Sequence, residues 1–431
     1  MIVTWRAVAL AGVLTLAVLV APRTATVLVA ALVVVLACAV DVAWAASPRD
    51  VVIEREVVPS AVRLGGTARS ALTLRNGSRR ALRGVVRDAW VPSAGAHDNR
   101  HPLGLPPGES TRTTTRLVPE RRGDRAAGAV TIRSLGPLGL AGRQASLPVR
   151  GRLRVLPEFA SRKHLPSRLA RLRELDGRAT VQVRGEGTEF DSLREYVIGD
   201  DVRSIDWRAT ARRGDVVVRT WRPERDRRVV VVLDTSRTAA ARVGDQPRLD
   251  AGIEAALLLA ALASHAGDRV DVLAYDRSVR ARVRGSAGTR LLPALAEALA
   301  TVEPALVEAD WPGLVAQVRA LVSQRALVVL VTTLDPAAVE TGLLPVVGPL
   351  AARHQVLVAS VADPELDALR ATRETSAAVY DAAAAERVGL ERAAVAGVLR
   401  QRGAEVVEAG PDELAPRVAD AYLALKAAGR L

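Results

Sequence analysis

The sequence contains few cysteines, lysines and aromatic residues. Its one cysteine, Cys38, cannot form an internal disulfide, so cysteine usage sets no redox compartment. Aromatic residues make up 3% of the chain, too few for the stacking platforms that bind single-stranded nucleic acids. Lysine occurs only at Lys163 and Lys426, so the net charge of +13 comes from arginines, which are spread along the chain and not clustered. We therefore expect no nucleic-acid partner.

The chain is long and apolar enough for several domains. It has 431 residues, 49% of them hydrophobic, which is material for two or three domains with a substantial core. Changes in the apolar pattern predict four segments. These are a membrane element over residues 1–46, a β-rich domain over 50–156, a linker with a charged block over 157–227, and an α/β domain over 228–431.

The first segment consists of two apolar runs, residues 7–21 and 25–46, separated by a short Pro-Arg-Thr break. The second run is long enough to cross the hydrocarbon of a bilayer, and the first is marginal unless Trp5 and Arg6 lie at the interface. We predict a transmembrane helical hairpin. The competing interpretation is a signal peptide cleaved after residues 43–45, although its charged region would then have to carry an additional apolar run.

A hairpin places both of its ends on one side of the membrane. Arg6, Arg49 and Arg55 lie on that side and outnumber Arg23 in the connecting turn, so the positive-inside rule predicts a two-pass plasma-membrane protein with a cytoplasmic body. Membrane lipid is thus one expected partner. Asp41 lies within the second run, about one helical turn from the interface, where its carboxylate can reach water or a partner helix.

Residues 50–156 consist of short alternating segments such as VVIEREVV, ALTLRN and GVVRDAWV. Turn signals stand between them, for example Leu-Gly-Gly, Asn-Gly-Ser and Pro-Pro-Gly. This pattern is typical of about six or seven short strands, and it predicts a small β-sandwich or barrel.

From residue 228 onward, apolar strands alternate with helical segments. Little polar alternation interrupts the strands, which is typical of buried parallel strands in a doubly wound α/β sheet of about five or six strands. The predicted strands cover 228–234, 270–276, 326–335, 355–363 and 404–408. The predicted helices cover 248–266, 290–300, 312–323, 336–353 and 411–428.

The carboxyl ends of these strands carry the candidate binding residues. Asp234, Ser236 and Thr238 stand in the order Asp-x-Ser-x-Thr after the first strand, so one loop can direct a carboxylate and two hydroxyls at a common point. Hard oxygen donors of this kind suit Mg²⁺ or Mn²⁺. Thr289, and Asp335 with Thr332 and Thr333, would complete the shell and leave one position for a partner's carboxylate. Helix N-capping is the alternative role for such residues.

The linker joins an amphipathic helical pattern, with leucines at 165, 169, 172 and 175, to a dense charged block over residues 184–213. We expect the helix to pack on the body, and we expect arginines of the block to pair with its aspartates in a network. Ile205 and Trp207 would anchor the block on the sheet. The alternative is that Arg194, Tyr196 and Asp206 line a binding surface near the metal loop, and partner docking is the favoured role for Glu186 and Glu189. The block's candidate residues are Glu186, Glu189, Arg194, Tyr196, Asp200, Asp201, Arg203, Asp206, Trp207 and Arg212.

The segment GEGTEFDSLREYVIGDDVRSIDWRATARRGDVVVRTWRPERDRRVVVVLDTS resembles the signature of the domain of unknown function 58 family, whose C-terminal part is similar to von Willebrand factor A domains. The Asp234-x-Ser236-x-Thr238 loop resembles that superfamily's metal-ion-dependent adhesion site, with Thr in place of the usual last Ser. Around Asp335 the chain reads Thr-Thr-Leu-Asp-Pro where the superfamily more often has Thr-Asp-Gly.

The resemblance implies a non-enzymatic adaptor that binds proteins through this site and works with a MoxR-type AAA+ ATPase in protein maturation or complex remodelling. The alternative is a structural factor of the cell envelope whose β-domain binds an envelope component. A hydrolase using Asp200, Asp201 and Asp206 is a third reading, which the nearby arginines disfavour because they neutralise those acids.

Overall fold

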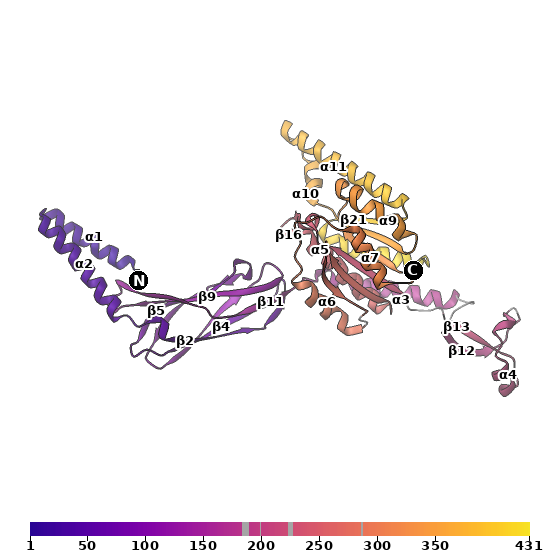
Figure 1. Ribbon diagram of the computed structural model, residues 1–431, viewed down its shortest axis with the longest axis horizontal. Helices are drawn as coiled ribbons and strands as arrows, with labels where there is room; N and C mark the ends of the chain where they lie inside the picture. Colours follow the sequence, from indigo (N-terminus) through magenta and orange to yellow (C-terminus); the bar gives the residue numbers. More distant parts are fainter. Residues whose placement is uncertain (183–188, 199, 223–226, 286–287) are drawn as a thin grey trace. The chain divides into compact units, whose positions relative to one another are not determined.

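The computed structural model describes residues 1–182, 189–198, 200–222, 227–285 and 288–431. The chain divides into two compact units, Met1–Glu158 and Phe159–Leu431, each with a core of its own (Figure 1). The structure as a whole is mixed α/β with several sheets.

The first unit begins with two apolar helices that pack against each other, α1 (Trp5–Val20) and α2 (Thr24–Trp44) (Figure 1). In the described residues, α2 with its continuation to Asp50 is the one helix long and apolar enough to cross a membrane. Helix α1 has 16 residues, fewer than the roughly 20 that a span requires. The second membrane pass therefore stays a prediction.

Asp41, near the end of α2, is fully buried at 0% exposure. One of its carboxylate oxygens accepts a hydrogen bond from the backbone N–H of Leu138 at 2.7 Å. The other accepts from the N–H groups of Leu140 at 2.5 Å and Ala141 at 3.0 Å. The expectation that Asp41 reaches water or a partner helix is wrong, because its carboxylate binds the turn that leads into strand β10 (Ala141–Leu147).

The rest of the first unit is two sheets that share an apolar core drawn from both of them. The outer segments of each sheet alternate buried and exposed residues, as a strand with one face on a core must. One sheet contains β1 (Ile2–Val3), β3 (Ala61–Arg63), β5 (Leu82–Trp90), β7 (Arg100–Leu105), β9 (Gly123–Leu135), β10 (Ala141–Leu147) and β11 (Arg152–Leu156). The other contains β2 (Val51–Val58), β4 (Ala68–Asn76), β6 (Ala96–His97) and β8 (Ser110–Leu117).

The second unit is built on a six-stranded sheet in the order β18-β17-β14-β19-β20-β21. Five strands are parallel, and β18 pairs antiparallel with β17 at one edge. Counted along the chain, the order is 3-2-1-4-5-6, the arrangement of doubly wound sheets whose direction of winding reverses between strands 1 and 4. The strands are β14 (Arg228–Asp234), β17 (Arg269–Tyr275), β18 (Val279–Val283), β19 (Leu327–Thr332), β20 (Gln355–Val361) and β21 (Ala404–Ala409).

Helices cover both faces of this sheet. Along β14, Val229, Val231 and Leu233 face one apolar cluster, while Val230 and Val232 face the other, which explains the uninterrupted valine run in the sequence. The first cluster takes in α3 (Leu165–Gln182), α5 (Arg248–His265), α6 (Leu291–Ala300) and α12 (Pro411–Ala427). The second takes in α7 (Trp311–Leu321), a π-helical turn (Val339–Leu343), α9 (Leu344–Ala351) and α11 (Ser376–Gln401).

Several elements differ from the predicted ones. The long helix α11 and the preceding α10 (Pro364–Ala371) were not predicted, and neither was the edge strand β18. Helix α11 is rich in alanine, so apolar periodicity does not reveal it, although alanine favours helix. The charged block contributes a small hairpin of β12 (Glu189–Glu195) and β13 (Val217–Arg222), with α4 (Trp207–Arg213) between them.

We predict that replacing Asp41 with Ala destabilises the first unit by about 3 kcal/mol, since three backbone N–H groups lose their acceptor. The measurement is the thermal unfolding of the full chain in detergent. Asp50→Ala, at an exposed position a few residues further on, is the control and should leave the transition unchanged. Equal transitions for the two variants would contradict the role given to Asp41.

Candidate functional site

Asp234 is the last residue of β14, the strand at which the winding of the sheet reverses. In doubly wound sheets, ligands bind outside the carboxyl ends of the strands at this reversal point. Strands β14 and β19 are neighbours there, so Thr332 at the end of β19 comes close to Asp234. The chain's topology therefore selects these two strand ends as the place for a site.

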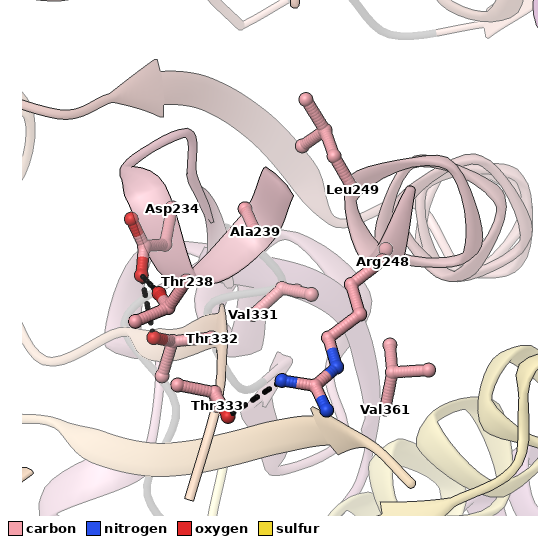
Figure 2. A pocket seen from close by; sticks show the side chains of 10 residues that line it. Asp234, Thr238, Ala239, Arg248, Leu249, Val331, Thr332, Thr333 and Val361 are labelled. Atoms are coloured by element: carbon pink, nitrogen blue, oxygen red, sulfur yellow. Dashed lines mark hydrogen bonds between the residues drawn. The ribbon is translucent and has the colours of Figure 1, made fainter. Parts of the chain in front are cut away.

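The Asp234 carboxylate accepts hydrogen bonds from three groups on two loops. One oxygen accepts from the backbone N–H of Ser236 at 2.8 Å. The other accepts from the hydroxyl of Thr332 at 2.7 Å and from that of Thr238 at 3.3 Å, as Figure 2 shows. The hydroxyls of Ser236 and Thr238 lie 3.2 Å apart. One carboxylate and three hydroxyl oxygens thus gather at a single point.

The cluster is buried, with Asp234 4% exposed and Ser236 2% exposed. No ion pair joins Asp234 to a cationic side chain in the part of the chain that the structure describes. The aspartate at the end of the neighbouring β17 differs in this respect. Asp276 is also buried, and Arg280 pairs with it at 2.6 Å. Burial would raise the pKa of Asp276, but the hydrogen bond from Arg280 and nearby backbone N–H groups lower it overall.

Two further aspartates at this edge of the sheet are helix caps. Asp335 accepts a hydrogen bond from the backbone N–H of Ala338 at the start of α8 (Pro336–Ala338), and Asp363 caps α10 in the same way. Asp335 is exposed, and its carboxylate is engaged with its own helix. Thr332, three residues before the end of the predicted strand, takes the place at Asp234 that the sequence predicts for Asp335.

The structure does not bring Thr289 to this cluster. The neighbouring Gly288 donates its backbone N–H to the hydroxyl of Ser264, in the last turn of α5. Helix α5 has 18 residues, a length of about 27 Å at 1.5 Å per residue. Its other end, at Arg248, lines a cavity with Asp234. Thr289 therefore lies at the opposite end of α5. Strand β18 runs antiparallel to β17, so it brings the chain back to the amino-terminal ends of the parallel strands.

A cavity of about 300 Å³ opens beside the cluster. Asp234, Ser236, Thr238 and Thr332 contribute to its wall. Arg237 also lines it and forms an ion pair with Glu308 on the opposite wall. Hydrogen bonding to Glu308 raises the pKa of Arg237. The cluster is thus open to a group approaching through this cavity.

The donor set fits a hard divalent cation. In the described chain, no group of three or more His, Cys, Asp or Glu side chains is placed to hold a metal ion. The Asp234 cluster is of another kind, with one carboxylate and hydroxyls from Ser236, Thr238 and Thr332. Mg²⁺ takes oxygen ligands, needs few from the protein and keeps several waters. A carboxylate buried without a cation also has a charge left to balance.

The charged block forms local pairs within its own hairpin. Arg194 holds Asp200 through two hydrogen bonds of 2.7 and 2.6 Å, as predicted. Asp206 accepts from the backbone N–H of Ala209 at the start of α4, and its other oxygen pairs with Arg219 at 2.8 Å. These interactions, with the Ala209 bond contributing most, lower the pKa of Asp206.

Other residues of the block have different positions from those expected. Asp201 caps a short turn through the backbone N–H of Arg203, whose side chain is exposed, as is that of Arg212. Neither arginine forms an ion pair with a described residue, so Arg219 takes the role that we had assigned to them. The Tyr196 backbone N–H bonds to Val216 across the hairpin.

The expectation that Ile205 and Trp207 anchor the block on the six-stranded sheet is wrong, because Trp207 is exposed and Ile205 bridges to a strand of the block's own hairpin. Trp207 is 69% exposed, so it is not packed in a core, whereas Ile205 is half-buried and bridges to Val218 of β13. Glu186 lies outside the described residues. Glu189 begins β12, and its side chain also lies outside them.

Comparisons with known proteins point to one family. Two similar curated proteins are the uncharacterized proteins Rv1480 of Mycobacterium tuberculosis and Mb1516 of Mycobacterium bovis, each 28% identical over 185 residues. The match covers 42% of this chain and 57% of the length of those relatives.

Two solved structures resemble part of the chain. A CARDB domain from Pyrococcus furiosus, solved with di-metal ions, has 16% identity and a TM-score of 0.19, covering 25% of this chain and 88% of the domain. A β-glucosidase from Erythrobacter marinus has 17% identity and a TM-score of 0.18, covering 25% of this chain and 15% of the enzyme. Neither score supports a shared overall fold.

The family match covers the hairpin and most of the six-stranded sheet, including Asp234 and Thr332. Residues 192–405 match the family described as protein of unknown function DUF58, which confirms the family resemblance for that part of the chain.

Proposed function

We propose that this protein is a membrane-anchored, non-enzymatic adaptor that binds other proteins through a Mg²⁺-dependent site at Asp234. The observation that carries the proposal is the buried Asp234 carboxylate, surrounded by hydroxyls and without a cationic partner in the described chain. Burying an uncompensated carboxylate costs several kcal/mol of free energy, roughly, and a bound divalent cation offsets that cost.

Asp234, Ser236, Thr238 and Thr332 are the side chains that would hold the ion. Together they provide one negative charge and three hydroxyl oxygens, which leaves room for waters and for one ligand from outside. The cavity of about 300 Å³ beside them gives a partner's Asp or Glu a route to the ion.

The resemblance to von Willebrand factor A domains supports the same proposal. It depends on the Asp-x-Ser-x-Thr loop, and the doubly wound strand order places this loop at the reversal point of the sheet. The DUF58 match is a separate finding, and the residues it covers, 192–405, include this loop. From the family we take the partner, a MoxR-type AAA+ ATPase, and the role in protein maturation or complex remodelling.

We expect the full chain in detergent to bind Mn²⁺, measured by electron paramagnetic resonance, and Asp234→Asn to weaken binding by more than about tenfold, since even outer-shell changes have effects of that size. Asp335→Asn is the matched control. It removes a carboxylate at the same edge of the sheet but keeps a good helix cap, so it should retain the wild-type affinity. Equal affinities for wild type and Asp234→Asn would exclude the proposed site.

The adaptor role predicts that a MoxR-type ATPase copurifies with the full chain in the presence of Mg²⁺. Asp234→Asn should lose this partner, and Asp335→Asn should retain it. A chelator should have the same effect as Asp234→Asn. If the ATPase is retained by Asp234→Asn at the wild-type level, partner binding does not depend on the metal site.

The orientation of the body separates the adaptor from an envelope factor. With a cytoplasmic body, protease added outside intact spheroplasts should leave both soluble units undigested, whereas inverted vesicles should expose them. The single apolar span identified in the described chain is weak support for membrane association and does not set the orientation. Digestion from outside would favour a structural envelope factor whose β-domain binds an envelope component.

A further inference from the structure

Arg248 is a second charged residue at the Asp234 site. It is the first residue of α5 and is half-buried. Its guanidinium points to Thr333, with the hydroxyl 3.4 Å from one terminal nitrogen. In Figure 2, the side chains of Asp234, Thr332, Thr333 and Arg248 follow one another along the wall of a small cavity. The cationic group therefore lies on the same side of the sheet edge as the proposed metal ligands.

Arg248 has no direct ion-pair partner among the described residues, although Asp335, Asp363 and Glu408 attract its charge from farther away. The Nε atom is buried and has no hydrogen-bond partner among the described residues, and no ion pair is formed with a described carboxylate. Burial, and then repulsion from Arg392, lower the pKa of the Arg248 guanidinium overall, and attraction to Asp363, Asp335 and Glu408 offsets part of this lowering. The N-terminal turn of a helix also disfavours a cation, because the helix dipole is positive there. A guanidinium in this position lowers the free energy of unfolding, so the fold by itself does not account for it.

Two other arginines in this region each form an ion pair with a carboxylate of the chain. Arg392 is buried and pairs with Glu408 at 2.5 Å. Arg237, which lines the larger cavity, pairs with Glu308. Both have a carboxylate of this chain as partner, whereas Arg248 faces a cavity.

The small cavity has room for about one oxygen atom. Its volume is about 20 Å³, and a site needs roughly 10–15 Å³ to hold one water. Asp234, Thr238, Thr332 and Thr333 line both this cavity and the one of about 300 Å³. A group that enters through the larger cavity can thus reach Arg248 with a single oxygen.

We propose that Arg248 receives one oxygen of an incoming carboxylate, while the other oxygen takes the open position on the metal held at Asp234. This inference rests on the proposed function and names the ligand as a carboxylate that is shared between a cation and a guanidinium. A carboxylate has two oxygens at fixed spacing, which suits two cationic groups on one wall, and a hydroxyl or amide lacks the charge to compensate both. Arg248 is then a specificity residue for acidic side chains.

The test uses acetate as the probe and Mn²⁺ as the ion. Paramagnetic broadening of the acetate methyl resonance reports acetate bound near Mn²⁺, so the other arginines of the chain do not contribute. The full chain in detergent is compared with Arg248→Gln, Arg248→Lys and the matched control Arg237→Gln, which removes a paired, exposed arginine at the same cavity. Thermal unfolding checks that each variant is folded, and replacing the partly buried Arg248, which has no ion pair, should not lower the midpoint.

We expect Arg248→Gln to bind acetate about tenfold more weakly than wild type, the effect of losing one charged hydrogen bond. Arg248→Lys should retain part of the affinity, and Arg237→Gln all of it. Mn²⁺ affinity should be unchanged or higher in Arg248→Gln, because a nearby positive charge is lost. If Arg248→Gln binds acetate like wild type, or if wild type binds none, the inference is overturned and the small cavity holds only water. If wild type binds no Mn²⁺, the proposed function itself fails and this inference with it.

Discussion

The structure of the second unit depends on the parallel pairing of β14 with β19 at the point where the sheet reverses its winding. This pairing has two effects on the residues at the strand ends. It buries the Asp234 carboxylate, and it supplies the hydroxyl of Thr332 from a strand nearly one hundred residues later in the chain. Helices cover both faces of the sheet, so the crevice at the strand ends remains as the opening to the cluster.

Much of this unit could be predicted because its strands are buried on both faces and appear as unbroken apolar runs. The predicted strands at 228–234 and 355–363 nearly coincide with β14 and β20. Helix α11 could not be predicted from periodicity, since its alanines fit a buried and an exposed face equally well. The antiparallel strand β18 was missed although its sequence, VRARV, alternates apolar and charged residues, which is the pattern of a strand with one face on a core.

Only the part of the site that is formed by residues close in the sequence could be predicted. Asp234, Ser236 and Thr238 lie within five residues of one another, so a local motif is enough to bring them together. The contribution of β19 depends on which of several polar residues faces the cluster. Asp335 is an exposed helix cap, whereas Thr332, three residues earlier, is half-buried and bonds to Asp234. The prediction for Thr289 was wrong because β18 is antiparallel and brings the chain back to the other end of α5. The spacing of residues in the sequence does not show the direction of a strand.

Charged residues that form an ion pair within the chain stabilise the fold, whereas charged residues without an ion pair are candidates for binding a ligand. In the hairpin, Arg194 compensates Asp200, and in the sheet Arg280 compensates Asp276. Each of these charges has a partner within the chain, so its removal is expected to affect stability. Asp234 and Arg248 have opposite charges and line the same cavity, yet they form no ion pair with each other. Had folding alone shaped this edge, the simplest arrangement would join them. Keeping the two charges apart destabilises the protein without ligands. A cation bound at Asp234 and an anion bound at Arg248 would offset that cost. The binding of each ligand is therefore expected to favour the binding of the other.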